Sequence, residues 1–403
     1  MAGFLIVFDK LDSLEKCIAE GIYSTYLKFP SRYPKNTTWS SSASGTLADY
    51  ISMKPGDNLY FFSSRKIYGV AEIVDMNLDG ISFFQCWKDS IILPTRNELD
   101  DCLFEPVEID GKGTYYYPWA VAFKPAPYVF KDPIDMDQML ASNPESFKAL
   151  RCLQARSFIK FDEKENRAFK SLFYRRNEKA LIDENIDDTY FVDYRRSCEI
   201  ATEYSKKYPI QFSKYVERHL KNDNQEKFAT EANLETSLMF DLNHDDSLAT
   251  SVFGKWDYLS HQVHASPAKP VEYMDRIDIF GYRYIPADIL GEDNKFISKY
   301  LIIELKNDSG NKNDVLQLMK YVDWVAREYA GNDYSMIEAY LVAPDFKSTA
   351  YSECNKSTKR YTNRAKPNRS KVIIWESLVW EGINLTKYTI QNDFSVKYEL
   401  IDF

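Results

Sequence analysis

The sequence predicts a β-rich N-terminal domain, a helical connector and a C-terminal α/β domain built on a mixed central sheet. Three observations predict this arrangement. Short apolar runs separated by turn residues fill residues 1–135, charged segments with apolar residues three and four apart fill residues 136–225, and helical and strand patterns alternate over residues 226–403. A chain of 403 residues also exceeds the size at which single cores stop growing, which is about 250 to 300 residues.

The composition is that of an ordinary globular protein. Hydrophobic residues make up 44% of the chain, and no run approaches the roughly 20 apolar residues that a membrane helix needs. The apolar start GFLIVF lacks the basic region and the length of a secretory signal, so we expect a cytoplasmic protein without a membrane partner. The six cysteines stand singly, without the close pairs of zinc or redox motifs, which predicts reduced structural thiols.

The first 135 residues are expected to form a compact set of strands. FLIVF predicts a strand, SLEKCIAEGI a short amphipathic helix, and DNLYFFSS with IYGVAEIV two strands paired through a turn. YYYPWAVAF is a further candidate strand. After the turn-forming KPAPYVFKDP, the segments FDEKENRAFKSLFYRRNEKALI and YSKKYPIQFSKYVERHLKN carry the helical period of the connector.

The C-terminal segment predicts the order helix, strand, strand, helix, strand. The helix is EKFATEANLETSLMFDL and the strands are DRIDIFGYR and KYLIIELK. After the turn NDSGNKND, a second helix places one apolar face toward the core: Val315, Leu318, Met319, Val322 and Val325. SMIEAYLVAP and KVIIWESLVW are expected to close the mixed sheet as strands.

Charged residues follow the apolar run of KYLIIELK. Glu304 and Lys306 stand two apart, so in a strand both project on the side opposite Leu305. Burying a charge without a partner is costly, so we expect these two residues to have a use. Asp278, between apolar neighbours in RIDIF, points away from the face that those neighbours bury. Two carboxylates and an amine can therefore converge at the ends of neighbouring strands.

The flanking helices add four polar residues to this set. Glu231 and Glu235 lie one turn apart on the upstream helix, and Gln317 and Tyr321 lie four apart on the downstream helix. Residues at these spacings share one helical face, so all four are candidates for the same polar pocket.

The order glutamate, aspartate, Glu-x-Lys and Gln-x-x-x-Tyr resembles the PD-(D/E)XK nuclease superfamily, in the branch with a trailing QxxxY motif, over residues 226–385. The resemblance implies a nuclease fold and a Mg²⁺-dependent endodeoxyribonuclease. Asp278, Glu304 and the backbone carbonyl of Leu305 would hold Mg²⁺ or Mn²⁺ through hard oxygen ligands. Lys306 would orient or deprotonate the attacking water, or stabilise the transition state. Glu231 is favoured over Glu235, because its spacing to two leucines resembles the first helix of the family.

A second candidate metal site is the run HQVH. It offers His261 and His264 as two ligands, but no cysteine or third histidine stands nearby. A polar loop is therefore the favoured interpretation of this run.

The front of the chain resembles PUA-like modules, especially the EVE and YTH families. GDNLYFFSSRKIYGVAEIV matches their central strand pair, and FLIVFDKLDSLEKCIAEGIYST is similar to the YTH opening. This resemblance implies a reader that holds a flipped, modified base by stacking it on aromatic side chains. Tyr23 matches the first cage aromatic, where the family prefers tryptophan, and Trp39, Phe84 and Trp87 lie near the loops of the other walls. Each of these four is alternatively a core aromatic.

The charge pattern confines nucleic-acid binding to a local patch, because the formal net charge of −9 repels a polyanion at long range. The segment NKSTKRYTNRAKPNRSK is the best such patch. Its basic residues suit contacts with the DNA backbone, and the alternative is a solvated loop. The candidates are Lys356, Lys359, Arg360, Arg364, Lys366 and Arg369.

Together these patterns predict a metal-dependent DNA endonuclease with a reader in front, a layout suited to antiviral restriction of foreign, modified or phage DNA. A homodimer is a further expected partner, because cutting both strands often needs two copies. The alternative is a non-catalytic nucleic-acid-binding module or RNA-directed factor on a nuclease fold. The intact set of Asp278, Glu304 and Lys306 favours the enzyme, because a decayed site would lose at least one member.

Overall fold

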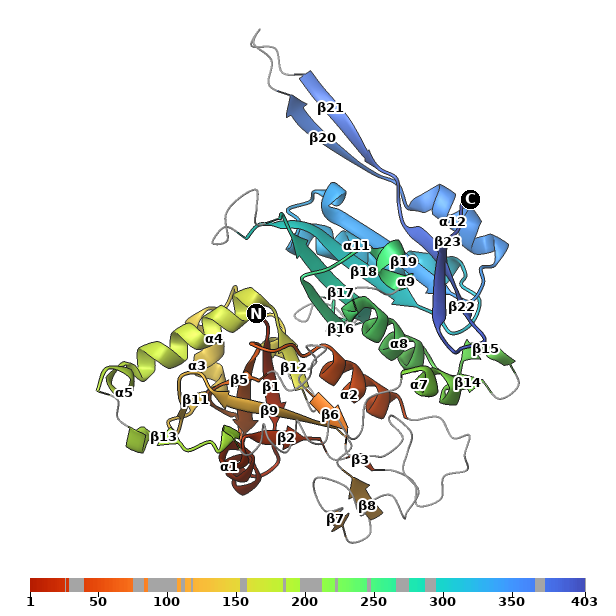
Figure 1. Ribbon diagram of the computed structural model, residues 1–403. Helices are drawn as coiled ribbons and strands as arrows, with labels where there is room; N and C mark the ends of the chain where they lie inside the picture. The colour runs from red at the N-terminus through yellow and green to blue at the C-terminus, as the bar shows by residue number, and fades with distance from the viewer. Residues whose placement is uncertain are drawn as a thin grey trace. The chain divides into compact units, whose positions relative to one another are not determined.

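The computed structural model groups the chain into two units, residues 1–218 and residues 219–403 (Figure 1). It describes residues 1–25, 27–28, 40–74, 83–85, 107–109, 113–116, 119–152, 158–183, 186–195, 212–221, 224–244, 248–265, 275–286, 295–366 and 374–402. None of the helices within these ranges is both long and apolar enough to cross a membrane.

The first unit is built on a sheet whose main path runs β12–β1–β4–β5–β9–β2. Its strands are β1 (Gly3–Val7), β2 (Ile22–Ser24), β4 (Asn58–Ser63), β5 (Lys66–Ile73), β9 (Trp119–Pro125) and β12 (Phe158–Phe161). Strands β1 and β4 are parallel, and the other neighbours on this path are antiparallel. The predicted hairpin is confirmed: β4 and β5 pair through Ser64 and Arg65, whose positive φ angles suit a tight two-residue turn.

Shorter strands and the helices complete this unit. The strands are β3 (Leu27–Lys28), β6 (Phe83–Gln85), β7 (Val107–Ile109), β8 (Gly113–Tyr116), β10 (Val129–Phe130), β11 (Ile134–Asp135) and β13 (Thr189–Tyr190). The helices are α1 (Leu11–Glu20), α2 (Ser41–Ile51), α3 (Met136–Ser142), α4 (Glu163–Arg176), α5 (Glu178–Ile182) and α7 (Phe212–Arg218), with 3-10 turns at Leu150–Cys152 and Ile186–Asp188.

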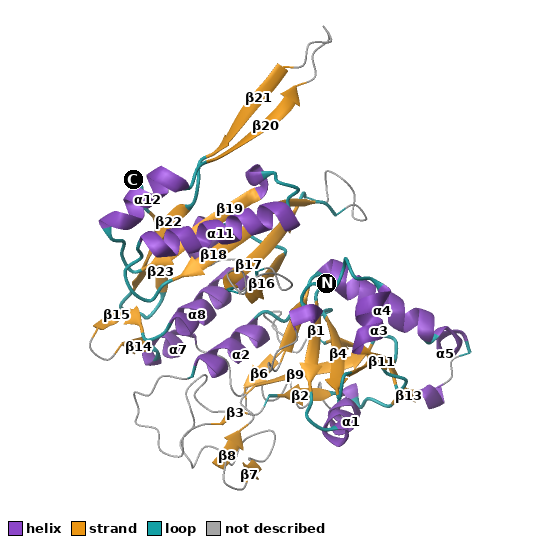
Figure 2. Ribbon diagram, turned by 180° about the vertical axis from the view of Figure 1, so that it is seen from behind, coloured by secondary structure: helices purple, strands orange, loops and turns teal. Residues whose placement is uncertain are grey.

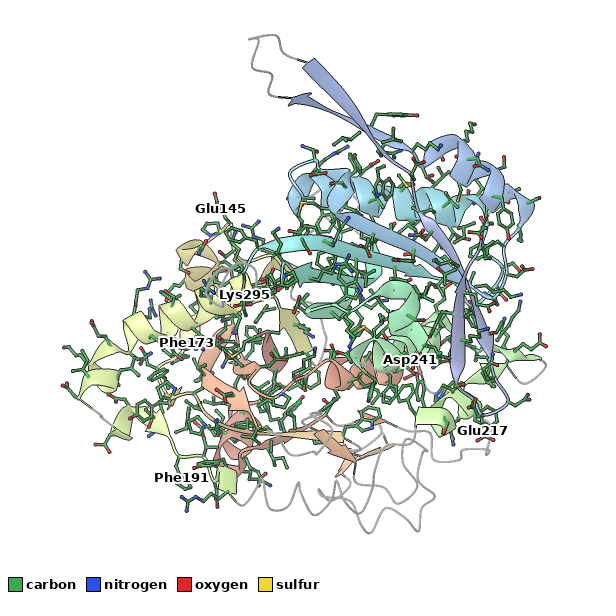
Figure 3. The ribbon with its side chains drawn as sticks, turned by 45° about the horizontal axis from the view of Figure 1, so that its top comes forward. Glu145, Phe173, Phe191, Glu217, Asp241 and Lys295 are labelled. Carbon is green, nitrogen blue, oxygen red and sulfur yellow. The ribbon has the colours of Figure 1, made fainter. Side chains whose placement is uncertain are left out.

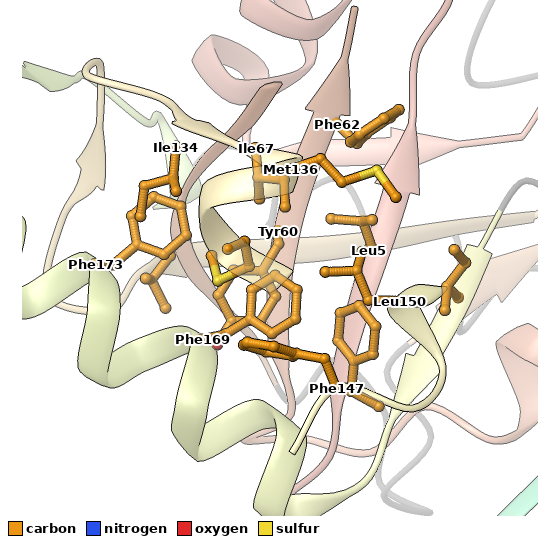
Figure 4. Packing of buried hydrophobic residues seen from close by; sticks show 14 of the residues in the cluster. Leu5, Tyr60, Phe62, Ile67, Ile134, Met136, Phe147, Leu150, Phe169 and Phe173 are labelled. Carbon is orange, nitrogen blue, oxygen red and sulfur yellow. The ribbon is translucent and has the colours of Figure 1, made fainter. Parts of the chain in front are cut away.

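Helix α4 packs its aromatic face onto this sheet (Figure 4). Phe169 stacks on Phe161 with ring centroids 4.5 Å apart and lies 4.7 Å from the ring of Tyr60. All three rings are fully buried. Residues 136–218, which the sequence predicts as part of a separate connector, therefore fall within the first unit, because the apolar face of α4 needs this sheet to cover it.

The second unit is built on a mixed sheet with the strand order β16–β17–β18–β19–β22–β23. Strands β18, β19 and β22 run parallel, and the remaining pairs are antiparallel. The strands are β16 (Tyr258–His264), β17 (Arg276–Tyr284), β18 (Ile297–Leu305), β19 (Ile337–Ala343), β22 (Asn384–Ile390) and β23 (Val396–Leu400). The predicted strands DRIDIFGYR, KYLIIELK and SMIEAYLVAP are confirmed, and so is the mixed character of the sheet.

The segment KVIIWESLVW contains a strand as predicted, but the prediction that this strand closes the central sheet is wrong. The segment contains β21 (Ile374–Trp380), which pairs with β20 (Arg360–Lys366) in a two-stranded ribbon that projects from the unit (Figures 1 and 2). The central sheet is closed instead by β22 and β23. An apolar strand pattern predicts the strand but not its neighbour, because pairing is decided by the tertiary fold.

The helices of this unit are α8 (Glu231–Asn243), α9 (Leu248–Phe253), α11 (Lys312–Glu328) and α12 (Ser348–Ser357), with a 3-10 turn at Tyr334–Met336. Helix α11 lies along β18 and β19 (Figure 2), and its predicted apolar face is buried. The first helix begins later than predicted. Glu226–Phe228 lie in β15 (Asn224–Phe228), which pairs with β14 (Leu220–Lys221), and Thr230 caps α8 by accepting a hydrogen bond from the backbone amide of Asn233.

A partly buried carboxyl links α8 to the last strand. Asp241 on α8 (labelled in Figure 3) accepts a hydrogen bond of 3.2 Å from the hydroxyl of Tyr398 on β23. Burial raises the pKa of Asp241 to about 7, and the Tyr398 hydroxyl only partly opposes this rise. The protonated form of Asp241 is therefore favoured in the folded state. Its contribution to the free energy of unfolding is greatest below the pKa that it has in the unfolded chain, and this contribution is lost as the pH rises through about 7.

We predict that Asp241→Asn stabilises the protein at pH 8 and that its advantage shrinks at pH 5. Asparagine keeps an acceptor for Tyr398 without the charge, and the expected gain at pH 8 is about 2 kcal/mol after allowance for partial exposure. Urea unfolding at both pH values measures the difference. The exposed Asp345→Asn is the control, and equal effects of Asp241→Asn at the two pH values would contradict the prediction.

Candidate active site

Three polar residues form one row across the first three strands of the second sheet. On β16 and β17, His261 pairs with Ile279 and Val263 with Ile277, which places Gln262 opposite Asp278. On β17 and β18, Ile279 pairs with Ile303, which places Asp278 opposite Glu304 by the same antiparallel count. Opposite residues on neighbouring strands share a face, so Asp278 and Glu304 lie side by side, and Gln262 lies beside Asp278, to which its side chain donates a hydrogen bond.

Helix α11 covers the face that carries these carboxylates. Strand alternation puts Asp278 on the same face as Phe280, and Glu304 on the same face as Tyr300. The rings of Phe280 and Tyr300 pack against Tyr329 at the end of α11, with centroids 5.1 and 5.7 Å apart. The carboxylates therefore lie on the sheet face that α11 packs against, with Glu304 buried and Asp278 partly exposed.

Asp278 is held through both of its oxygens. Its Oδ2 accepts a hydrogen bond of 2.7 Å from the backbone amide of Leu305, and its Oδ1 accepts one of 3.2 Å from Nε2 of Gln262. Burial raises the pKa of Asp278 well above its ordinary value, and the charges of Glu304 and Glu235 raise it further. The backbone of Leu305 therefore contacts the site through its amide and fixes the orientation of Asp278.

Glu304 and Lys306 form the predicted pair. The Lys306 ammonium donates a hydrogen bond of 2.7 Å to Oε1 of Glu304 and lies 3.7 Å from Oε1 of Glu231. Burial raises the pKa of Glu304 to about 7 against the opposing charge of Lys306. Burial by itself lowers the pKa of Lys306, but the charges of Glu304, Glu231 and Asp278 outweigh it and raise the pKa above the ordinary value. Lys306 is therefore a cation in this site, suited to neutralising charge.

The two glutamates of α8 occupy different environments. The side chain of Glu231 is 46% exposed and faces Lys306, whereas that of Glu235 is 4% exposed. Glu235 Oε1 lies 2.5 Å from Nδ1 of His261, and its Oε2 accepts a hydrogen bond of 2.5 Å from Nε2 of Gln262. Burial raises the pKa of Glu231, partly offset by Lys306. Both glutamates therefore contact residues of the site. Glu231 lies beside Lys306, and Glu235 binds Gln262, which in turn donates a hydrogen bond to Asp278.

Gln317 and Tyr321 contact each other on α11. Nε2 of Gln317 donates a hydrogen bond of 3.0 Å to the hydroxyl of Tyr321, whose side chain is buried. Burial raises the pKa of Tyr321, and the negative charge of Glu304 raises it further. Tyr321 therefore stays neutral near the carboxylates, where its hydroxyl can serve as a hydrogen-bond donor.

The oxygen atoms present suit a hard divalent cation. Oε2 of Glu304 is buried and has no hydrogen-bond partner within the described residues, which leaves an acceptor free for a ligand. Carboxylate oxygens are the ligands that Mg²⁺ and Mn²⁺ prefer. In the part of the chain that the structure describes, no three His, Cys, Asp or Glu side chains are already grouped as a metal site. The Lys306 ammonium takes the other oxygen of Glu304 instead, so a bound cation would compete with it.

The run HQVH is a strand rather than the polar loop that the sequence favours. It forms the end of β16, where His261 and Gln262 bind Glu235. Sequence reasoning identified His261 as a candidate ligand but missed Gln262 as a site residue. The signal was the position of the run, which follows Tyr258, Leu259 and Ser260 and stands upstream of RIDIF.

The basic segment begins on α12 and continues along the ribbon. Lys356 lies in the last turn of α12, and Lys359 lies 3.6 Å from Glu381. Arg360 binds both carboxylate oxygens of Asp323 at 2.9 Å, so it anchors β20 to α11. Positions 364 and 366 lie on β20, and Arg369 is outside the described residues. The role of this segment in DNA binding stays a prediction.

The predicted base-reading aromatics are only partly described. Tyr23 is 8% exposed, and its ring packs edge-on against Phe8 and Phe158 with centroids 5.4 and 5.5 Å apart. The backbone of Phe84 lies in β6, and Trp39 and Trp87 lie outside the described residues. In this conformation Tyr23 is a core aromatic, and the reading role of all four stays a prediction.

Comparisons with known proteins give partial likenesses. No protein-family model and no curated protein matches the chain. A repair endonuclease from Pyrococcus abyssi is 20% identical over 27% of this chain and 38% of its own, with a TM-score of 0.18. An EndoMS–dsDNA complex is 24% identical over 20% of this chain and 28% of its own, with a TM-score of 0.15. Protein Atu2648 from Agrobacterium tumefaciens is 12% identical over 41% of this chain and 88% of its own, with a TM-score of 0.22. The chain spans less than two fifths of the two endonucleases, and these likenesses carry no conclusion about its activity.

We predict that Lys306→Met binds Mn²⁺ more tightly than the parent, whereas Glu304→Gln and Asp278→Asn bind it at least about tenfold more weakly. Removing the ammonium frees Oε1 of Glu304, and removing a carboxylate charge removes a ligand. Isothermal titration with MnCl₂ measures each affinity, with Asp345→Asn as the control. Weaker binding by Lys306→Met would contradict competition between the lysine and the metal.

Proposed function

We propose that this protein is a metal-dependent DNA endonuclease that hydrolyses phosphodiester bonds at the site formed by Asp278, Glu304 and Lys306. The observation that carries the proposal is the convergence of these residues on one face of the sheet, with a buried oxygen of Glu304 that has no hydrogen-bond partner among the described residues. Structural ion pairs usually satisfy their buried oxygens, so an unsatisfied one favours a ligand site.

The residues divide the work of hydrolysis between them. Asp278 and Glu304 would hold Mg²⁺ or Mn²⁺, which when bound supplies a nucleophilic hydroxide and counters charge on the phosphate. Lys306, kept cationic by the carboxylates around it, stabilises the negative charge that develops on the phosphate oxygens. Glu231 holds Lys306 from the exposed side at 3.7 Å, and the neutral hydroxyl of Tyr321 adds a hydrogen-bond donor near Glu304.

The proposal extends to restriction of modified or phage DNA. Its support is the pairing of this site with a first unit whose sequence resembles PUA-like base readers, because a nuclease site has no means of sparing host DNA on its own. The projecting ribbon adds a second expectation, that positions 364 and 366 of β20 bring basic residues to the DNA backbone.

The central prediction is that Asp278→Ala, Glu304→Ala and Lys306→Met each lower the cleavage rate at least about 1000-fold, because charge stabilisation at the reacting phosphate is lost. Plasmid cleavage with Mg²⁺ or Mn²⁺, with and without chelator, measures this, and anisotropy confirms that DNA binding is retained. Asp345→Asn is the matched control. Full metal-dependent cleavage by Lys306→Met would contradict the assignment of Lys306 as a catalytic residue. DNA binding by the parent without any cleavage would favour the non-catalytic alternative.

A second prediction concerns the ribbon. In the Asp278→Ala background, Arg364→Ala with Lys366→Ala should weaken binding similarly for all DNA sequences and lower the salt slope by about 0.9 for each lost phosphate contact. Anisotropy titrations over a range of salt measure the slope. Lys320→Ala with Lys397→Ala removes the same charge from two exposed positions elsewhere in the unit. Arg360 is left intact, because it anchors the ribbon to Asp323. Equal slopes in the two double variants would show that the ribbon does not contact phosphates.

A base-reading first unit implies that the affinity of the full chain for DNA depends on the bases present. The Asp278→Ala protein should bind duplexes containing one class of modified base at least about tenfold more tightly than unmodified duplexes, because a flipped base gains stacking energy. A panel with N6-methyladenine, 5-methylcytosine and hypermodified phage DNA measures this. Uniform affinity across the panel would exclude the reader while leaving the nuclease assignment in place.

A further inference from the structure

Gln262 adopts a backbone conformation that is unusual for a residue inside a strand. Its φ is +51°, in the left-handed region that non-glycine residues rarely enter. Four other non-glycine residues of the described chain have positive φ, and all four lie outside the strands: Ser64, Arg65, Asn332 and Phe394. Strain of this kind persists where the surrounding structure requires it, and it clusters at functional sites.

The side-chain amide of Gln262 lies between two carboxylates. Nε2 of Gln262 donates to Oε2 of Glu235 at 2.5 Å and to Oδ1 of Asp278 at 3.2 Å. An amide nitrogen carries two hydrogens and no charge, so these two bonds use its full donor capacity. Glutamine can therefore bridge two carboxyl groups without adding a charge.

This bridge leaves the two carboxylates with different roles. Asp278 is fixed by Gln262 on one oxygen and by the Leu305 amide on the other. Glu235 is buried behind it, in contact with His261 through Oε1 and with Gln262 through Oε2. Glu235 therefore holds Gln262 in place and, through it, Asp278. Glu304, in contrast, keeps a buried oxygen without a hydrogen-bond partner among the described residues.

We propose that Gln262 is a positioning residue, which holds Asp278 against Glu235 in the orientation that binds a divalent cation, and that the left-handed backbone exists to deliver this amide. The proposal rests on the proposed function, in which Asp278 is a metal ligand. Partners that orient a metal ligand typically change metal affinity by about 10- to 100-fold when removed.

Two substitutions separate the amide from the backbone strain. Gln262→Gly removes the amide, while glycine adopts positive φ freely and so retains the backbone. Gln262→Met retains the side-chain length without a donor. We expect both to lower Mn²⁺ affinity about 10- to 100-fold, measured with MnCl₂ alone by calorimetry and by the electron paramagnetic resonance of free Mn²⁺.

Asn332→Gly is the matched control, because Asn332 has a φ of +65° in the turn after α11 and, among the described residues, makes no hydrogen bond to the site carboxylates. It should leave Mn²⁺ affinity unchanged. Unchanged affinity in Gln262→Gly overturns the proposal, and if that variant fails to fold, unchanged affinity in Gln262→Met does so.

DNA cleavage is measured separately from metal binding, so the results that contradict the proposed nuclease function differ from those that contradict the positioning role of Gln262. A parent that binds Mn²⁺ without cutting DNA contradicts the nuclease, while a loss of affinity in the Gln262 variants still supports the positioning role. A parent that cuts DNA, with Gln262 variants that bind Mn²⁺ as tightly as the parent, overturns the positioning role alone. A parent that binds no Mn²⁺ overturns both.

Discussion

The ion pair between Lys306 and Glu304 makes the rest of the second unit's site possible. Asp278 and Glu304 lie opposite each other on neighbouring strands, where burial raises the pKa of Asp278 and the like charge of Glu304 raises it further. Lys306 supplies the compensating positive charge at 2.7 Å. The uncharged donors of Gln262 and the Leu305 backbone stabilise Asp278 without adding charge. Four carboxyl groups surround this one ammonium, so the site carries a formal negative charge when they are ionised, and that charge favours a cation.

The fold sets this geometry through strand register. The antiparallel pairing of β16, β17 and β18 aligns Gln262, Asp278 and Glu304 in a row, and a slip by one residue would turn every member of the row to the opposite face. Parallel pairing of β18 with β19 then holds Lys306, whose backbone amide donates to the carbonyl of Val342 at 2.8 Å. The sheet therefore positions the end of β18 from both sides, and the site needs few loop residues.

Anchoring contacts give the ribbon of β20 and β21 a fixed base. Arg360 binds Asp323 on α11 through two hydrogen bonds, and Nε1 of Trp380 donates to the carbonyl of Ile337 at 3.0 Å. The hydroxyl of Tyr334 also donates to Asp323. One arginine of the basic segment is thus structural, which shows that a cluster of basic residues in a sequence does not by itself identify which of them face DNA.

The sequence by itself determined three of the six strands of the second sheet, β17, β18 and β19, and the grouping of Asp278, Glu304 and Lys306 as a candidate site. Short apolar patterns identified β17 and β18, and helical spacing identified the buried face of α11. Side-chain alternation then grouped Asp278, Glu304 and Lys306. Those signals are local, so they are readable from neighbouring residues. Only the tertiary structure decided that HQVH is a strand, that Gln262 bridges two carboxylates, that β21 leaves the central sheet and that α4 belongs to the first unit's core. Each of these depends on contacts between residues far apart in the chain, and the free energy of such contacts is not encoded in any short window of sequence.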